Sequence, residues 1–231
     1  MHFDSFVLCA ATADLADADH PAAREHADAV EYRMDLADDP LEALDDYDAD
    51  LPILATNRPD WEGGKARDGP GRLRTLRAAT AIDAVEAIDV ELDSVLDGDA
   101  EELLEVAGER AVSVVVSAHD FEGTPPRPEL VRTLTEAGKY GDVAKLAVTA
   151  ETRADALALL SATEQLTAHG DRVATMAMGE VGSHTRAVAP VYGSKIGYAP
   201  VDPAAATAPG QYDLARLAEL VETLSPSKRE N

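Results

Sequence analysis

The residue best suited to covalent chemistry is Lys145, in the middle of the apolar stretch Asp142–Thr149. Its neighbours on both sides are Val, Ala and Leu, whereas the other lysines lie beside Gly, polar or turn residues. Burial among apolar side chains favours the neutral amine, which attacks carbonyl groups and forms imines. The alternative is a structural lysine at a strand end whose ammonium reaches solvent.

A histidine ends the most apolar predicted strand, Ala111–His119, which has three consecutive valines at its centre. Because imidazole titrates near neutral pH, His119 is well placed to transfer protons. A lone histidine is more often a packed core residue. The lysine on the next predicted strand favours the functional interpretation.

Three charged residues alternate along the second predicted strand, which ends Glu31-Tyr32-Arg33-Met34-Asp35. Successive strand side chains point to opposite faces, so Glu31, Arg33 and Asp35 should share one face. Since buried charges must be paired, the three either form a structural ion network or bind a polar ligand. The sequence leaves both alternatives open.

A basic and an acidic residue follow the third predicted strand. Arg58 ends that strand and is a fork-shaped donor for hydroxyls or a carboxylate, and Glu62 lies in the loop that follows. Taken alone, this is an ordinary strand-to-helix loop.

Two later loops could hold an anion. Gly179–Arg186 is rich in glycine, but its spacing matches no phosphate-binding loop. Thr207 and Gln211 flank a Pro-Gly turn and offer a hydroxyl and an amide. No metal site is expected: the acidic run around Asp48 lacks the Gly and Glu of a calcium loop, and no histidine pair has zinc spacing.

Eight apolar segments that alternate with helical ones must position these residues. The predicted strands are Phe6–Ala13, Ala29–Asp35, Leu51–Arg58, Ala87–Leu92, Ala111–His119, Val143–Thr149, Arg172–Met178 and Ser194–Ala199. The clearest predicted helices are Arg72–Ala87, Ala100–Gly108, Glu129–Gly138, Thr152–Ala168 and Leu214–Leu224.

This order predicts an α/β protein with a (β/α)8 TIM-barrel fold, in which polar residues at the carboxyl ends of the strands face the substrate. A doubly wound open sheet is the rival, but it would usually have a Gly-rich turn after its first strand. We expect one barrel domain over residues 1–225 and a polar tail over residues 226–231.

The composition restricts the partners and the compartment. The formal net charge is −24, with 44 acidic and 20 basic residues, and such a surface repels nucleic acid. The acids are spread over predicted helices and turns, a pattern that resembles proteins of salt-loving cytoplasms. Cys9 is the only cysteine, which excludes an intrachain disulfide. No signal peptide or membrane span is found, so we expect a cytoplasmic protein with no membrane partner.

Six short motifs occur together in one order. They are Glu-Tyr-Arg-Met-Asp, Thr-Asn-Arg with Glu-Gly-Gly, Ser-Ala-His-Asp-Phe, Ala-Lys-Leu-Ala, Met-Ala-Met-Gly-Glu-Val-Gly and Ala-Pro-Gly-Gln. In that order the chain resembles type I 3-dehydroquinate dehydratases over nearly its whole length, and the acidic composition suggests a halophilic archaeal source. The resemblance implies a (β/α)8 barrel that dehydrates 3-dehydroquinate to 3-dehydroshikimate, the third step of the shikimate pathway to chorismate, without metal or cofactor.

The resemblance also implies roles for individual residues. It assigns the imine to Lys145, general acid/base catalysis to His119 and orientation of the histidine to Glu62. Contacts to ring hydroxyls fall on Glu31, Arg33 and Arg58, and contacts to the substrate carboxylate on Arg186, Gln211 and Thr207. The chain departs from the family pattern at Thr185 and Thr207, where serine is commoner, and at His184, where an apolar residue is usual. Family members are commonly homodimers.

Two rivals stay open. Another lysine-imine barrel, such as a class I aldolase or transaldolase, would want a phosphate-binding loop near the seventh and eighth strands. A non-catalytic sugar-acid or quinate binding protein would keep its role without Lys145.

Overall fold

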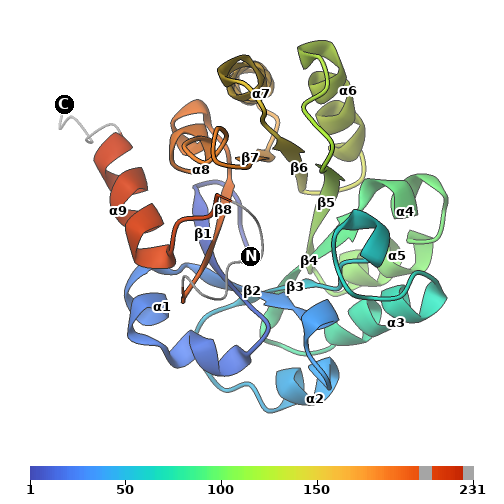
Figure 1. Ribbon diagram of the computed structural model, residues 1–231. Coiled ribbons are helices and arrows are strands. Elements are labelled where there is room, and N and C mark those ends of the chain that lie inside the picture. Colours follow the sequence, from blue (N-terminus) through green and yellow to red (C-terminus); the bar gives the residue numbers. More distant parts are fainter. Residues whose placement is uncertain (203–209, 226–231) are drawn as a thin grey trace.

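The computed structural model describes residues 1–202 and 210–225. Eight strands alternate with helices along the chain (Figure 1). The strands are β1 (Val7–Thr12), β2 (Ala29–Arg33), β3 (Ile53–Thr56), β4 (Val85–Glu91), β5 (Ser113–Asp120), β6 (Val143–Thr149), β7 (Val173–Met178) and β8 (Ile196–Pro200). The predicted tail lies outside the described residues, and the domain boundary before it stays a prediction.

The helices surround the strands on the outside of the molecule (Figure 1). They are α1 (Pro21–His26), α2 (Pro40–Asp45), α3 (Pro70–Ala79), α4 (Leu92–Leu96), α5 (Glu101–Glu109), α6 (Arg127–Ala137), α7 (Arg153–Ala168), α8 (Thr185–Val188) and α9 (Leu214–Leu224). Short 3-10 helices are η1 (Leu15–Asp19), η2 (Met34–Leu36), η3 (Asp60–Glu62) and η4 (Ala189–Tyr192). No helix of the described part is long and apolar enough to cross a membrane.

All paired strands are parallel, in the order β7-β6-β5-β4-β3-β2-β1-β8. The first and last strands of this order meet at a seam, where the amide of Lys195 donates to the carbonyl of Val173 over 2.8 Å. Farther along β7, side-chain hydroxyls take the place of a strand partner: Thr175 N donates to Ser194 Oγ and Ala177 N to Thr185 Oγ1. The eight strands thus form a nearly closed barrel, and the predicted (β/α)8 fold is confirmed.

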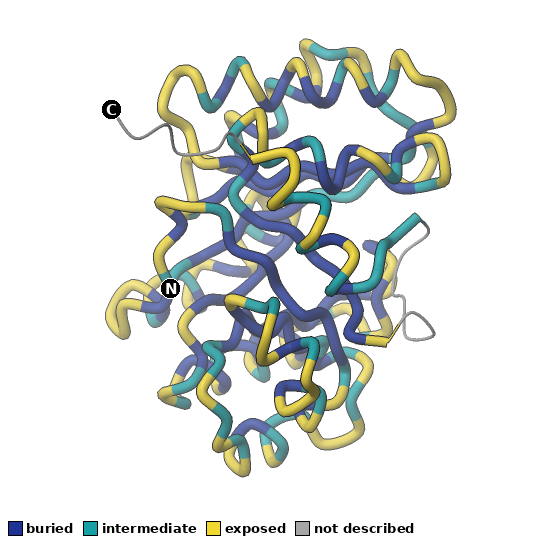
Figure 2. Tube along the Cα trace, turned by 90° about the vertical axis from the view of Figure 1, so that its left-hand side faces the viewer, coloured by how far each residue is buried: buried dark blue, intermediate teal, exposed yellow. Residues whose placement is uncertain are grey.

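Side chains alternate between the barrel interior and the helix layer. On β6, Val143 and Ala147 belong to the interior cluster, while Ala144, Leu146 and Val148 pack in the outer core beneath the helices. Figure 2 shows the result as a buried inner layer with exposed residues on the outer sides of the helices. Lys145 lies between two interior residues of its strand, so alternation directs it into the barrel.

Two predicted boundaries were wrong. The helix predicted to run to Ala87 ends at Ala79, where the hydroxyl of Thr80 donates to the carbonyl of Arg77, and β4 begins at Val85. The second strand ends at Arg33, since Met34–Leu36 is a 3-10 turn. Asp35 therefore lies beyond the strand rather than on its inner face.

Candidate active site

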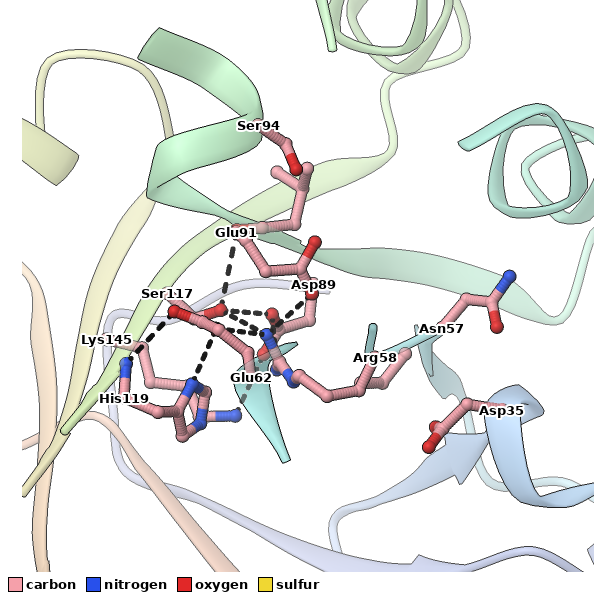
Figure 3. Close-up of polar contacts among 12 residues, drawn as sticks. Asp35, Asn57, Arg58, Glu62, Asp89, Glu91, Ser94, Ser117, His119 and Lys145 are labelled. Carbon is pink, nitrogen blue, oxygen red and sulfur yellow. Dashed lines mark hydrogen bonds and ion pairs between the residues drawn. The ribbon is translucent and has the colours of Figure 1, made fainter. Parts of the chain in front are cut away.

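Lys145 is buried in the barrel interior and has two anionic neighbours. Its Nζ donates to Asp89 Oδ2 over 2.8 Å (Figure 3). It also lies 3.8 Å from Glu31 Oε1 and 4.2 Å from the ring centroid of Tyr198. The residues that flank it in the sequence point into the helix layer, so the groups nearest the amine come from other strands, Glu31 of β2 and Asp89 of β4. The neutral amine that the sequence predicted stays a prediction.

His119 and Glu62 form a pair at the carboxyl ends of the strands. His119 Nδ1 lies 2.9 Å from Glu62 Oε2, and the His119 amide donates to Glu62 Oε1 over 3.2 Å. The second contact fixes the carboxylate relative to the backbone of β5. Residues from the η3 loop and from β5, far apart in the sequence, are thereby joined at two points.

Burial shifts the pKa values of this pair in opposite directions. It raises the pKa of Glu62 to about 7, although the positive charge of Arg58 opposes the rise. It lowers the pKa of His119 well below its usual value, and Arg58 and Lys145 lower it further. The imidazole is therefore neutral at neutral pH. Above the Glu62 pKa of about 7 the carboxylate accepts the Nδ1–H hydrogen bond, and the other ring nitrogen keeps a lone pair for proton abstraction.

Arg58 is the centre of a buried ion network. Its Nη1 donates to Glu91 Oε1 and Ser117 Oγ, each over 2.7 Å, and to Glu62 Oε2 over 3.3 Å. Its Nη2 donates to Asp89 Oδ1 over 2.8 Å. Burial by itself would lower the pKa of Arg58, but Asp89, Glu91 and Glu62 raise it above its ordinary value. One guanidinium thus connects the partner of Lys145 to the partner of His119 (Figure 3).

Asp89 and Glu91 of β4 are functional candidates that the sequence interpretation missed. Asp89 is fully buried, and Arg58 and Lys145 hold its pKa below its ordinary value even though burial opposes this. Glu91 bridges Arg58 and Arg72, with 2.5 Å to the latter. The signal was present: Asp89 and Glu91 alternate with apolar residues at the end of a predicted strand, the same pattern that singled out Glu31 and Arg33.

The charges of β2 separate into two groups. Arg33 makes a two-pronged pair with Asp35, with Nε 2.9 Å from Oδ1 and Nη2 2.8 Å from Oδ2. Glu31 instead accepts from Thr56 Oγ1 over 3.2 Å and faces Lys145. The ion network that the sequence left open is therefore present for Arg33 and Asp35, while both Glu31 and Arg33 also line the cavity.

Arg186 is a buried cation that is only partly satisfied by the described residues. It is 5% exposed, burial lowers its pKa to about 10, and its buried Nε has no hydrogen-bond partner within residues 1–202 and 210–225. The preceding Thr185 anchors it, because Thr185 Oγ1 accepts from Ala177 N and donates to Gly182 O over 2.8 and 2.7 Å. His184 is exposed, with Nδ1 3.1 Å from the carbonyl of Val181.

One cavity of about 80 Å³ brings the predicted site residues together. Its lining includes all of those that the structure describes: Glu31, Arg33, Arg58, Glu62, His119, Lys145, Arg186 and Gln211. Thr207 lies outside the described residues. Within the described residues, no group of three His, Cys, Asp or Glu side chains could hold a metal ion.

These features define a (β/α)8-barrel enzyme whose candidate site lies at the carboxyl ends of the strands. The family model for type I 3-dehydroquinase matches residues 6–228. The chain belongs to the type I 3-dehydroquinase family, as its motifs predicted.

Similar proteins agree with this assignment. The 3-dehydroquinate dehydratase of Haloarcula marismortui is 58% identical over 97% of this chain and 98% of its own. That of Halobacterium salinarum is 52% identical over 97% of this chain and the whole of its own. The crystal structure of 3-dehydroquinate dehydratase from Geobacillus kaustophilus superimposes with a TM-score of 0.83 at 27% identity, covering 98% of this chain and 93% of that one. Both sequence relatives come from halophilic archaea, in keeping with the acidic composition.

Proposed function

We propose that this chain dehydrates 3-dehydroquinate to 3-dehydroshikimate through an imine on Lys145, with His119 as general acid and base. The observation that carries the proposal is that a buried lysine amine and a neutral imidazole face the same cavity. Family membership supports the substrate and favours dehydration over the aldolase rival.

Imine formation begins as the Lys145 ammonium gives a proton to the oxygen of the approaching ketone. The amine adds to the carbonyl carbon, a second proton moves from nitrogen to the new hydroxyl group, and that group leaves as water to give an iminium ion. This cation carries the same charge as the ammonium it replaces, so Asp89 at 2.8 Å remains its counter-ion. A fixed carboxylate in a water-poor site stabilises that charge without reorganisation.

Proton transfer follows from the iminium, which makes the neighbouring C–H bond acidic. The free ring nitrogen of His119 removes that proton, and the electron pair forms an enamine. The enamine then expels the β-hydroxyl group, which His119 protonates, so that one water leaves. A second water hydrolyses the product imine and restores Lys145. A placed histidine contributes about 10²–10⁴ in rate to such steps.

Substrate binding is assigned to the charged groups around these two residues. Arg186, whose Nε has no partner among the described residues, is suited to a two-pronged pair with the substrate carboxylate, supported by Gln211 and Thr207. Glu31 and Arg33 are proposed to contact ring hydroxyls. Arg58 lines the cavity as well, but its Nη nitrogens already donate to carboxylates, so we assign it mainly to positioning Glu62 and Asp89.

The test is reduction with borohydride in the presence of 3-dehydroquinate at high salt, followed by peptide mass spectrometry. We expect a stable adduct on Lys145, no turnover in Lys145→Ala, and normal labelling in a Lys139→Ala control, since Lys139 is exposed. In His119→Ala we expect the adduct to form while the ultraviolet absorbance of the conjugated enone fails to grow. An unlabelled Lys145, or full activity in Lys145→Ala, would refute the imine.

We also propose that the enzyme acts in the cytoplasm as a homodimer, as the resemblance implies. Size-exclusion chromatography with light scattering at high salt tests the assembly. A single species with the mass of one chain would refute the homodimer.

A further inference from the structure

A large aromatic side chain stands over the histidine while half exposed to solvent. Phe121 follows His119 by two residues, is 49% exposed, and lines the cavity. Its ring stacks on the His119 ring, with a centroid distance of 6.0 Å and an angle of 12° between the planes. Such an offset, nearly parallel arrangement is one that aromatic pairs favour.

The tip of the Phe121 ring lies against the loop that carries Glu62. The next residue, Gly63, has a φ of 77°, and a Cβ built there would lie 2.5 Å from Phe121 Cζ. Only a residue without a side chain leaves room for the ring in this position. Phe121 therefore touches the neighbour of Glu62 and the ring of His119 at once.

The backbone beneath this ring is firmly held despite its exposure. Thr149 Oγ1 donates to the carbonyls of Phe121 and Asp120 over 3.1 and 3.2 Å. Asp120 Oδ1 in turn accepts from the amides of Glu122 and Gly123, each over 3.0 Å. The ring is thus presented by a fixed turn anchored to β6, the strand that carries Lys145.

We propose that Phe121 is a positioning residue of the dehydration, whose ring locks the His119–Glu62 pair in place and keeps water from its open side. The inference rests on the proposed function. Phe121 acts through the pair rather than on the reacting atoms, and the close fit over Gly63 is what sets its position.

The electrostatics explain why covering the pair matters. The charged groups that face His119 from the surrounding elements are Glu62, Arg58, Lys145, Asp89 and Arg33. Burial is the largest cause of both pKa shifts in the pair, raising that of Glu62 and lowering that of His119. Without the ring, water should reach both groups, and both pKa values should return toward their ordinary ranges.

The experiment compares kcat, KM and imine trapping in Phe121→Leu, Phe121→Tyr and Gly63→Ala at high salt. We expect kcat of Phe121→Leu to fall about 10- to 100-fold, because a displacement of about 1 Å at a catalytic pair costs that much. KM and the borohydride adduct on Lys145 should be nearly unchanged. Phe121→Tyr keeps the ring and should restore kcat.

Gly63→Ala should reproduce the loss, because its methyl group displaces the ring. The matched control is Gly170→Ala, at a φ of 93° with open space around it and at the opposite end of the barrel, before β7. In the double variant Gly63→Ala with Phe121→Leu, the two losses should not add, since the collision is gone. Additive losses would contradict the proposed contact between Phe121 and the loop that carries Glu62 and Gly63.

Direct titration of His119 by nuclear magnetic resonance provides the second measurement, with His119→Asn to assign the signal. The pKa of His119 should rise in Phe121→Leu and stay low in Phe121→Tyr. An unchanged titration together with wild-type kcat in Phe121→Leu would overturn the inference. Failure of borohydride labelling in the wild type would instead refute the imine, so the two failures are distinguishable.

Discussion

The two sides of the cavity handle charge in opposite ways. On the β3–β5 side, Arg58 is matched by Asp89, Glu91 and Glu62, and the groups hold one another in place. On the seam side, between β7 and β8, Arg186 has a lowered pKa and a buried Nε that meets no partner in the part of the chain that the structure describes. Paired charges are suited to positioning, and an unsatisfied cation is suited to binding an anion. Ion pairing, rather than the state of one nitrogen, makes the difference: Arg72 also has a buried Nε without a partner among the described residues, but it pairs with Glu91.

The largest effect on stability is expected from Arg58→Met. Removing this guanidinium leaves three buried carboxylates each short of a partner, which should lower the free energy of unfolding by about 3–5 kcal/mol. Urea unfolding at high salt measures it. The control is Arg216→Met, which breaks an exposed pair with Glu219 and should change little. Equal losses of stability in the two variants would mean that the ion pairs of Arg58 do not stabilise the β3–β5 side of the cavity.

Arg186→Leu should show the opposite behaviour. Loss of a charge-assisted partner for the substrate carboxylate should lower kcat/KM by an amount equivalent to about 2–5 kcal/mol. Stability should be unchanged or higher, because an unsatisfied buried cation is removed. Steady-state kinetics and urea unfolding on the same samples test both parts, and a large loss of stability with intact kinetics would reverse the comparison.

Glu62 should make stability depend on pH in a particular direction. Its pKa is raised to about 7 in the folded protein against 4.5 as its ordinary value, so the folded state binds more protons between these pH values. Its contribution is present below about pH 4.5 and is lost as pH rises through 7, amounting to at most about 3 kcal/mol. Glu62→Gln should therefore be more stabilising, or less destabilising, at pH 8 than at pH 5. Urea unfolding of both proteins at both pH values provides the test. A variant that is relatively more stable at pH 5 than at pH 8 would mean that burial does not dominate the pKa of Glu62.

A smaller effect is expected at the seam. Thr185→Val keeps the shape of the side chain but leaves the buried amide of Ala177 without its acceptor, which should cost about 1–3 kcal/mol of unfolding free energy. Thr185→Ser keeps the hydroxyl and should stay close to the wild type. If the valine variant is equally stable, the hydroxyl does not substitute for a strand partner.

Much of the barrel could be predicted because alternating apolar and helical segments are a local property. Val114, Val115 and Val116, or the run around Lys145, identify buried strands without any knowledge of their neighbours. Boundaries were harder to predict, since periodicity does not mark where an element ends: α3 stops before Thr80, whose hydroxyl donates to the carbonyl of Arg77. Asp35 is a second example, because it lies beyond β2 and pairs with Arg33.

By itself, the sequence determined which strands form, which residues can react, and that a lysine and a histidine lie on successive strands. Only the tertiary structure decided the surroundings of those residues. Asp89 reaches Lys145 from β4, and Glu62 reaches His119 from the η3 loop, contacts that span 56 and 57 positions in the chain. The physical reason is that alternation and propensity act between near neighbours, whereas charge and protonation depend on every group that folding brings within a few ångströms.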